Sequence, residues 1–274
     1  MDADPEEEYL NIKLHGTNEQ FQLSDFPWAY GYAKHLTERL LLRMFQDGQI
    51  SRLGKDTEPS SFPSKFLIIR PSVIGPSQTW PYTNFEVSGS VPALTFAAAI
   101  ITDPSFEINC SSRLDEPFTE ATTNEIPVDM VVNSILMHLV YESRGIVHAV
   151  APKGQLISAG DFMRGWTKIR RLPWMPVMVW KKVHWRSREL STLARIFVLW
   201  GTSYDFSHDS NERLVARMSA DELESFPLYA SRHPVVDGCY DFTGRREAVL
   251  GCVETILRRK GYPAWMSRFL WRNP

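Results

Sequence analysis

The sequence has little of several features that would place it in common classes of protein. It has only three cysteines in 274 residues, with no Cys-x-x-Cys among them, so it predicts neither a disulfide framework nor a zinc site. No run approaches the roughly 18 consecutive apolar residues of a membrane-spanning helix. The formal net charge is only -2, which gives no overall attraction to nucleic acid. These absences favour a folded protein of a reducing compartment.

Other signatures are also absent. The first eight residues include five Asp and Glu, whereas secretory and mitochondrial leaders are basic, so we expect no leader of either kind. There is no His-Glu-x-x-His and no pair of histidines at ligand spacing, which predicts that no metal is bound. There is no Gly-x-Ser-x-Gly, so a serine hydrolase has no support. We expect a cytoplasmic protein, either free in solution or peripheral on an organelle membrane.

Apolar spacing predicts alternating helices and strands in the first 160 residues. Helices are expected over Ala29–Met44 and from Pro127 to Val140, and strands over Phe66–Ile69, Phe106–Cys110 and Ile146–Val150. The strand at Phe66–Ile69 is expected to be buried on both faces, as in a parallel sheet. The apolar faces expected for the two helices are Ala33, Leu36, Leu40, Leu41 and Met44, and Val128, Val131, Val132, Ile135, Leu136, Leu139 and Val140.

The remaining patterns suggest a loop, a helix cap and a second domain. Residues 49–64 are rich in Ser, Pro and charge and predict a surface loop. Ser158 lies three residues before Asp161, which predicts a helix cap. Beyond residue 160 the pattern becomes mostly helical, over residues 190–200, 210–218, 220–226 and 245–260. We therefore expect an α/β domain with a parallel sheet over residues 1–160, and a helical domain over residues 161–274.

One pair of residues suggests carbonyl chemistry. Tyr30 and Lys34 are four residues apart, which places both on one face of the expected helix. Reduction of a carbonyl needs a proton for the developing alkoxide, and a neighbouring ammonium favours the phenolate form of a tyrosine. The spacing is weak evidence by itself, because an ordinary amphipathic helix with a surface lysine and a half-buried tyrosine shows the same pattern.

The context of this pair carries a more specific resemblance. The expected helix is followed by a strand and then by Arg-Pro-Ser-Val-Ile-Gly-Pro-Ser at residues 70–77. This order resembles the fatty acyl-CoA reductase and thioester reductase branch of the extended short-chain dehydrogenases. Residues 125–133 resemble the family's segment that closes the substrate domain, and residues 205–211 with 219–222 resemble its helical C-terminal domain. The resemblance runs from about Ala29 to about Lys260.

The resemblance implies a fold, a cofactor and a reaction. It implies a partial Rossmann-like sheet over residues 1–160, the remainder of an NAD(P)-binding and substrate domain, followed by the helical C-terminal domain. Tyr30 and Lys34 would be catalytic, and the backbone of Pro71, Ser72 and Val73 would lie against the nicotinamide of NADPH. The implied activity is NADPH-dependent reduction of a fatty or polyketide acyl thioester, carried on CoA or on a carrier protein, to the aldehyde or the primary alcohol.

The sequence departs from that family at the nucleotide end. It has no Gly-x-x-Gly-x-x-Gly fingerprint, and the 29 residues before Tyr30 predict an acidic loop rather than the strand that carries the family's catalytic Ser or Thr. We therefore expect the nucleotide-binding half to be absent. A catalytically inactive remnant or an acyl-binding partner stays an alternative. Another extended short-chain dehydrogenase, such as a sugar-nucleotide epimerase, is a third, against which the helical C-terminal stretch argues.

One segment is both basic and aromatic. Between Phe162 and Arg188 there are eight basic residues and no acidic one, interleaved with four tryptophans: Arg164, Lys168, Arg170, Arg171, Lys181, Lys182, Arg186 and Arg188, with Trp166, Trp174, Trp180 and Trp185. This pattern suggests a surface for anionic lipid headgroups or CoA phosphates. The alternative is a helical domain whose tryptophans are core and whose arginine stems cover them. The tail around Trp265 and Phe269 repeats the pattern and favours the surface.

Overall fold

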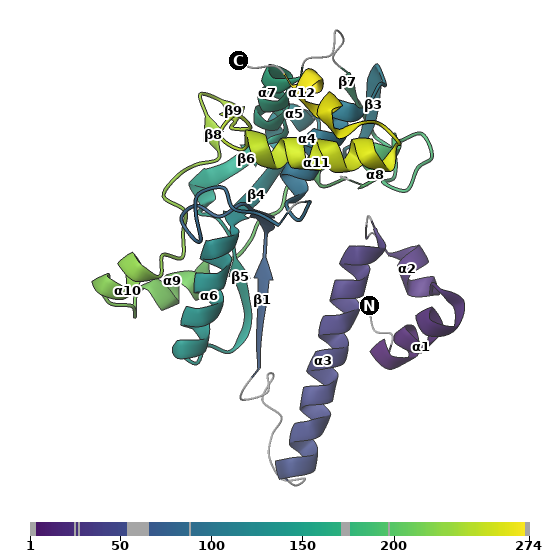
Figure 1. Ribbon diagram of the computed structural model, residues 1–274. Coiled ribbons are helices and arrows are strands. Elements are labelled where there is room, and N and C mark those ends of the chain that lie inside the picture. The colour runs from purple at the N-terminus through teal and green to yellow at the C-terminus, as the bar shows by residue number, and fades with distance from the viewer. Residues whose placement is uncertain are drawn as a thin grey trace. The chain divides into compact units, whose positions relative to one another are not determined.

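The computed structural model describes residues 4–53, 66–170 and 176–271, apart from Asp25, Pro27, Ser88 and Phe197. The chain forms two compact units, one of Met1–Ile68 with Glu142–Ile146 and one of Ile69–Tyr141 with Val147–Pro274. Figure 1 shows the elements of both units. The domain boundary expected near residue 160 lies inside the second unit.

The first unit is helical. It contains α1 (Pro5–His15), α2 (Glu19–Leu23) and α3 (Ala29–Leu53). The expectation of an acidic loop before Tyr30 is therefore wrong. Asp4 caps α1 by accepting a hydrogen bond from the Glu6 N–H, and Gly16 ends the helix with a φ of 73°. The acidic residues lie in the first turn of α1, where the helix dipole favours negative charge.

Helix α3 confirms the expected helix and extends beyond it. It continues to Leu53, so the loop expected from residue 49 is wrong up to that point, and residues 54–64 of that loop lie outside the described residues. The expected apolar face is also wrong in part. Leu36 is buried, but Leu41 and Met44 are exposed, because α3 packs against α1 with the face that carries Tyr32 and Leu36.

The described strands form four small sheets, and two of the strand pairs are parallel. β1 (Leu67–Pro71) pairs with β5 (Gly145–Ala149), and β2 (Val73–Gly75) pairs in parallel with β4 (Thr122–Pro127). β3 (Glu107–Ser111) pairs in parallel with β7 (Val177–Lys181), while β6 (Leu156–Ser158) joins β4 in antiparallel orientation. The short hairpin of β8 (Val235–Val236) and β9 (Cys239–Tyr240) completes the set. The chain is therefore an α/β protein with parallel strand pairs.

Three expected strands are confirmed as β1, β3 and β5, within about two residues at each end. The expectation that the first is buried on both faces is wrong. Most residues of β1 are half-buried, and among the described residues this strand pairs only with β5.

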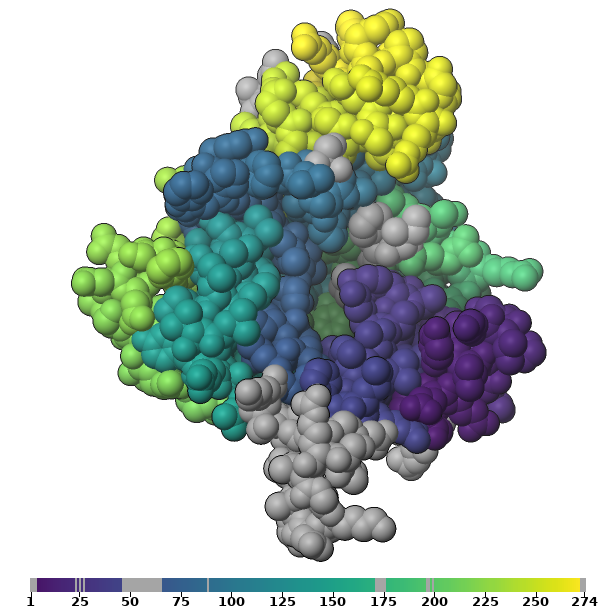
Figure 2. Space-filling model, turned by 60° about the horizontal axis from the view of Figure 1, so that its bottom comes forward, coloured from purple at the N-terminus to yellow at the C-terminus, as the bar shows by residue number. Residues whose placement is uncertain are grey.

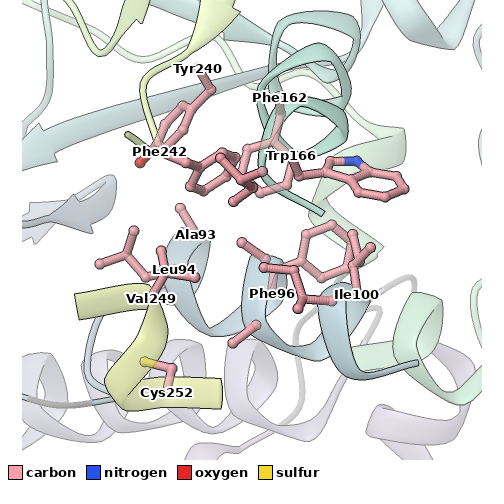
Figure 3. Close-up of a cluster of buried hydrophobic side chains, with 14 of the residues drawn as sticks. Ala93, Leu94, Phe96, Ile100, Phe162, Trp166, Tyr240, Phe242, Val249 and Cys252 are labelled. Atoms are coloured by element: carbon pink, nitrogen blue, oxygen red, sulfur yellow. The ribbon is translucent and has the colours of Figure 1, made fainter. Parts of the chain in front are cut away.

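An apolar core unites the two ends of the second unit. Helix α4 (Pro92–Thr102) is apolar on nearly all sides and packs against α11 (Arg246–Arg259), while α7 (Ala159–Ile169) contributes Phe162 and Trp166. Figure 3 shows these side chains meeting Tyr240 and Phe242 from the C-terminal segment. Residues on both sides of position 160 therefore share one core. Ser158 and Asp161 form a capping box at the start of α7, as expected.

Helix α6 (Val128–Val140) forms where expected but buries a different face. Its buried residues include Met130, Val131, Ser134 and Met137, whereas most of the expected apolar face is exposed: Val132, Ile135, Leu136, Leu139 and Val140. Apolar spacing alone cannot distinguish the two faces, because both carry apolar side chains.

The remaining elements are short. They are α5 (Pro117–Glu120), η1 (Lys153–Gln155), α8 (Thr192–Ile196), η2 (Val198–Gly201), α9 (Asp209–Val215), α10 (Ala220–Ser225), η3 (Ala264–Met266) and α12 (Ser267–Leu270). Together with α11, they confirm the four helical stretches expected after residue 160. The strands β7, β8 and β9 were not expected there.

Candidate functional site

The Tyr30–Lys34 pair lies on one face of α3, as its spacing predicts. Tyr30 is 67% exposed, and the Lys34 Nζ lies 5.5 Å from the centre of its ring. Both residues lie in the first two turns of α3, where Gly31 lies close to the Phe26 ring. The Tyr30 hydroxyl is therefore available to a ligand, with an ammonium near its ring.

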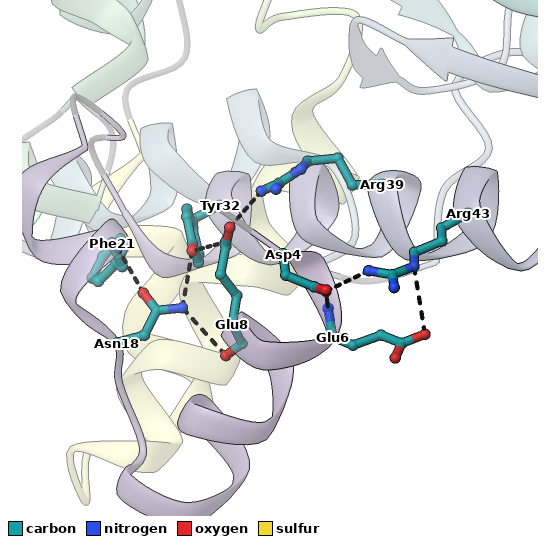
Figure 4. Close-up of polar contacts among 8 residues, drawn as sticks. All are labelled: Asp4, Glu6, Glu8, Asn18, Phe21, Tyr32, Arg39 and Arg43. Carbon is teal, nitrogen blue, oxygen red and sulfur yellow. Dashed lines mark hydrogen bonds and ion pairs between the residues drawn. The ribbon is translucent and has the colours of Figure 1, made fainter. Parts of the chain in front are cut away.

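A second tyrosine, two residues further, is closed to ligands. Tyr32 is 3% exposed, and its hydroxyl donates to Glu8 Oε2 at 2.5 Å and accepts from Asn18 Nδ2 at 2.9 Å (Figure 4). The same carboxylate receives Arg39 Nη1 at 2.8 Å, and Asn18 also caps α2 through the Phe21 N–H. This cluster of Glu8, Asn18, Tyr32 and Arg39 joins α1 and α2 to α3.

The surroundings of Tyr32 suit a structural role. Burial, with the hydrogen bond to Glu8, raises the pKa of Tyr32 to about 12. Its hydroxyl therefore stays protonated and already has partners. Of the two tyrosines at the start of α3, only Tyr30 presents its hydroxyl to the outside.

The Pro71–Val73 segment is tied into the second unit. The Ser72 N–H donates to the Ala149 carbonyl at 3.0 Å, and its Oγ donates to Asn124 Oδ1 at 2.6 Å. Asn124 also bonds both the N–H and the carbonyl of Ala151. Ser72 thus fastens the bend between β1 and β2 to β4 and to the end of β5, while Pro71 is exposed.

The glycine of the Arg-Pro-Ser-x-x-Gly stretch makes room for a buried carboxylate. A Cβ on Gly75 would lie 2.6 Å from Glu125 Oε1. Glu125 cannot move aside easily, because it accepts from Tyr240 Oη at 2.7 Å and pairs with Arg245 Nη1 at 2.9 Å. Burial raises the pKa of Tyr240 well above its usual range, although the Arg245 cation opposes this. This group connects β4 to the C-terminal segment.

Asp129 holds the loop that follows β2. Its carboxylate accepts hydrogen bonds from the backbone N–H groups of Gln78, Thr79 and Trp80, at 2.8–3.1 Å, and from the Thr79 hydroxyl at 3.0 Å. Burial would raise the pKa of the Asp129 carboxyl, but the three N–H donors outweigh it and hold that pKa below its usual range. The carboxylate therefore shapes the loop and is not available as a base.

A groove of about 700 Å³ opens beside this loop within the second unit. Its lining is mostly apolar and comes from three segments: Thr79, Trp80, Pro81 and Phe85; Val128, Asp129, Val132 and Asn133; and Glu224, Ser225, Phe226 and Pro227. Two of these segments directly follow the carboxyl ends of the parallel strands β2 and β4. In open α/β sheets, ligands bind in the crevice at that end of the strands.

The walls of the groove are fixed in advance by hydrogen bonds. Asn133 Nδ2 donates to the Pro227 carbonyl at 3.0 Å. Gln78 bonds both the side chain and the N–H of Ser231, at 2.9 and 3.0 Å. A groove of this size and lining, formed before any ligand arrives, suits a small molecule with an apolar body.

The predicted site residues are divided between the two units. Tyr30 and Lys34 belong to the first unit, and Pro71, Ser72 and Val73 belong to the second. The prediction that all five line one cavity stays a prediction. Sequence reasoning did not find the groove. The only signals were the resemblance of residues 125–133 and the Ser-Gln-Thr-Trp-Pro loop, which lines the groove together with residues 224–227 only because of the fold.

The basic and aromatic segment after Phe162 is not the exposed surface that its pattern suggested. Trp166 is fully buried and Trp185 nearly so, and Trp174 lies outside the described residues. Several cations have partners: Arg164 pairs with Asp161, Lys182 with Asp115, and Arg170 is buried with a bond to the Asp103 carbonyl. The interpretation of these tryptophans as interfacial is therefore wrong for Trp166 and Trp185.

Comparison with known proteins adds no family. No protein-family model matches the chain, and no curated protein matches it significantly. The resemblance to acyl-CoA reductases therefore rests on the motifs quoted above. No described helix is both long and apolar enough to cross a membrane. Within the described ranges, no cluster of three or more His, Cys, Asp or Glu side chains could hold a metal ion.

Proposed function

We propose that this chain is the acyl-binding and proton-donating part of an acyl thioester reductase of the acyl-CoA reductase type. In this proposal β1, β2, β4 and β5 belong to a Rossmann-like sheet, and the groove between the β2 loop and α6 holds the acyl chain. The observation that carries the proposal is this groove. It is apolar and preformed, and it lies at the carboxyl ends of two parallel strands just after the Arg-Pro-Ser segment.

Tyr30 is the proton donor in this proposal. When hydride adds to a thioester carbonyl, the oxygen takes a proton from the exposed Tyr30 hydroxyl, and the hemithioacetal formed then loses the thiol to give the aldehyde. Lys34, whose ammonium lies over the Tyr30 ring, stabilises the phenolate that remains. Tyr32 cannot take this role, because its hydroxyl is buried between Glu8 and Asn18.

The nucleotide does not fit the residues present. NADPH would supply the hydride, but its pyrophosphate needs a glycine-rich turn at a helix N-terminus, and the sequence has no such fingerprint. The Ser72 N–H, near the expected nicotinamide position, is already bonded to Ala149. The proposal for this chain therefore covers the acyl group and the proton, not the nucleotide.

The groove can be tested by calorimetric titration with palmitoyl-CoA, using free CoA as the reference ligand. Val132 and Leu139 are both exposed apolar residues of α6, but only Val132 lines the groove. Val132→Gln is expected to weaken palmitoyl-CoA binding about tenfold, since one buried valine contributes roughly 1.5 kcal/mol. Leu139→Gln is expected to leave the affinity unchanged. Equal loss in both variants, or equal affinity for free CoA, would contradict the proposal.

A second candidate is an acyl-binding protein without reductase activity. The groove supports it equally, because an apolar groove needs only an apolar ligand. It predicts the same palmitoyl-CoA binding, but it gives Tyr30 no role. The two candidates can be distinguished by an assay of acyl-CoA reduction in the presence of a nucleotide-binding partner. Tyr30→Phe abolishes this reduction only if the chain belongs to a reductase.

A further inference from the structure

The C-terminal segment that follows α11 presents exposed aromatic rings on a firmly held backbone. α11 ends in a Schellman motif, in which the Tyr262 N–H bonds the Leu257 carbonyl and the Gly261 N–H bonds the Arg258 carbonyl. Gly261 takes a φ of 78°, which allows this turn. Beyond it, η3 and α12 pack back against α11.

Buried residues alternate with exposed ones along this segment. Leu257 and Trp271 are in the apolar core, and Ser267 is fully buried with its Oγ on Glu254 Oε1 at 3.2 Å. Between them, three aromatic side chains lie outside: Tyr262, Trp265 and Phe269, at 53%, 62% and 60% exposure. The Trp265 and Phe269 rings meet edge to face with centres 5.5 Å apart. Their exposure therefore belongs to a packed segment and not to a loose tail.

Four cations flank these rings along the chain, and one of them, Arg268, shares a surface pocket with Glu247 and Glu254. Arg258, Arg259, Lys260 and Arg268 are all exposed, and no Asp or Glu occurs from residue 255 to the last residue. Arg258 lies 3.8 Å from Glu254, and in the described part of the chain no ion pair involves Arg259, Lys260 or Arg268. Arg258, Arg259 and Lys260 also lie at the C-terminus of α11, where the helix dipole favours positive charge. That role does not explain why the aromatic rings are exposed. Figure 2 shows the C-terminal residues, in yellow, as one continuous surface.

We infer that this C-terminal patch, formed by Tyr262, Trp265 and Phe269 with the four cations, docks on an anionic lipid membrane. Trp and Tyr combine an apolar body with a polar tip and favour the interface of a bilayer, while Lys and Arg bind the anionic headgroups. The segment after Phe162 has a similar composition, but its tryptophans are core and several of its cations are paired. The exposed pattern is therefore found in the tail.

Two features favour a membrane over other anionic partners. Duplex DNA has no apolar layer into which the exposed rings of Trp265 and Phe269 could insert. An acidic protein would need hydrogen-bonding groups at the centre of the patch, where the structure instead places the rings of Trp265 and Phe269. A planar surface that accepts rings and cations together matches the patch best.

Vesicle flotation with the full chain tests this inference. Binding is expected to phosphatidylcholine vesicles that contain phosphatidylserine, with weak binding to phosphatidylcholine alone and loss of binding at high salt. The triple variant Arg258→Gln, Arg259→Gln, Lys260→Gln is expected to weaken binding by about a hundredfold, since each cation at the surface contributes roughly fivefold. The matched control, Lys153→Gln, Arg188→Gln, Arg232→Gln, removes three exposed cations elsewhere and is expected to retain most of the binding.

The aromatic part is tested by Trp265→Ala with Phe269→Ala. Both side chains are exposed, so the fold should survive, as thermal unfolding can verify. The double variant is expected to bind at least tenfold more weakly, while lipids brominated in the acyl chains should quench tryptophan fluorescence in the wild type and less in the variant. Three results would overturn the inference. They are equal binding to neutral and anionic vesicles, equal loss of binding in the two triple variants, and displacement of the chain from vesicles by duplex DNA at the same concentration of phosphate groups.

Discussion

The two compact units are held together in opposite ways. In the first unit, helices α1, α2 and α3 meet around the buried carboxylate of Glu8, which is satisfied by Tyr32 and Arg39. In the second, α4, α7 and α11 meet around fully buried apolar side chains such as Leu94, Phe162 and Trp166. The first unit has the pair Tyr30 and Lys34 at its surface, and the second has apolar surface in its groove. Substitutions should therefore act through charge in one unit and through volume in the other.

The largest expected effect is loss of apolar volume in the second unit. Phe162 contacts Phe96, Trp200, Tyr240 and Phe242, with ring centres 4.0–5.5 Å away. Phe162→Ala is expected to lower the free energy of unfolding by about 3–5 kcal/mol, because the cavity cannot close around so many rings. Urea unfolding measures this. A loss below about 1 kcal/mol would show that the core is loosely packed. Phe118→Ala, at an exposed ring of the same unit, is the control.

The first unit should respond to removal of one charge at constant shape. Glu8→Gln removes the buried carboxylate that pairs with Arg39 and is expected to destabilise the first unit by about 2–3 kcal/mol. Hydrogen exchange should quicken in α1 and α3 and stay unchanged in α4 and α11. Glu7→Gln removes an exposed carboxylate from the same helix turn and should have little effect. Equal exchange in both variants would contradict a central role for Glu8.

The groove depends on both charge and apolar packing, because the carboxylate of Asp129 shapes the loop that forms its apolar wall. The pKa of Asp129 is lowered in the folded state, so its contribution is present above the unfolded pKa and is lost as pH falls through the folded pKa. Palmitoyl-CoA binding is therefore expected to fall only as pH drops through this lowered pKa, below the usual Asp value of about 3.9. Asp129→Asn should weaken palmitoyl-CoA binding at pH 7, because a hydrogen bond to a charged group contributes about 2 kcal/mol. It should also remove the dependence of binding on acid pH. Asp115→Asn, at an exposed carboxylate, should not.

The last expected effect is absent at neutral pH and appears only at alkaline pH, in the first unit. The folded pKa of Tyr32 is raised to about 12, above its unfolded value, so the folded state holds a proton that the unfolded state releases. Stability should fall between about pH 10 and pH 12, by at most about 1.4 kcal/mol per pH unit. Tyr32→Phe should flatten this dependence. The same slope in the wild type and in Tyr32→Phe would exclude Tyr32 as its source.

What could be predicted from the sequence was local in the chain. The Tyr30–Lys34 face and the Ser158–Asp161 capping box each depend on residues within four positions, and the structure places both as expected. Helix α4 was not predicted, because a segment that is apolar on all sides has no helical period to detect. The prediction of the buried face of α6 was wrong because both faces of this helix carry apolar side chains.

Features assembled from distant segments could not be predicted. The groove needs residues 224–227 beside residues 79–85, and the Glu125–Arg245 pair spans 120 positions. Glu8 belongs to an acidic run in which Glu6 and Glu7 are exposed, so nothing in the local sequence distinguishes it as the buried member. Likewise, the composition of residues 162–188 and of the tail is similar, and only tertiary packing decides which tryptophans are buried.

The central claim is that this chain binds an acyl thioester and not the nucleotide. Parallel calorimetric titrations of the purified chain with palmitoyl-CoA and with NADPH test it most directly. The account predicts micromolar binding of palmitoyl-CoA, NADPH binding no tighter than about millimolar, roughly -4 kcal/mol, and no loss of NADPH absorbance when both are present. Micromolar NADPH binding, or the absence of palmitoyl-CoA binding, would contradict it.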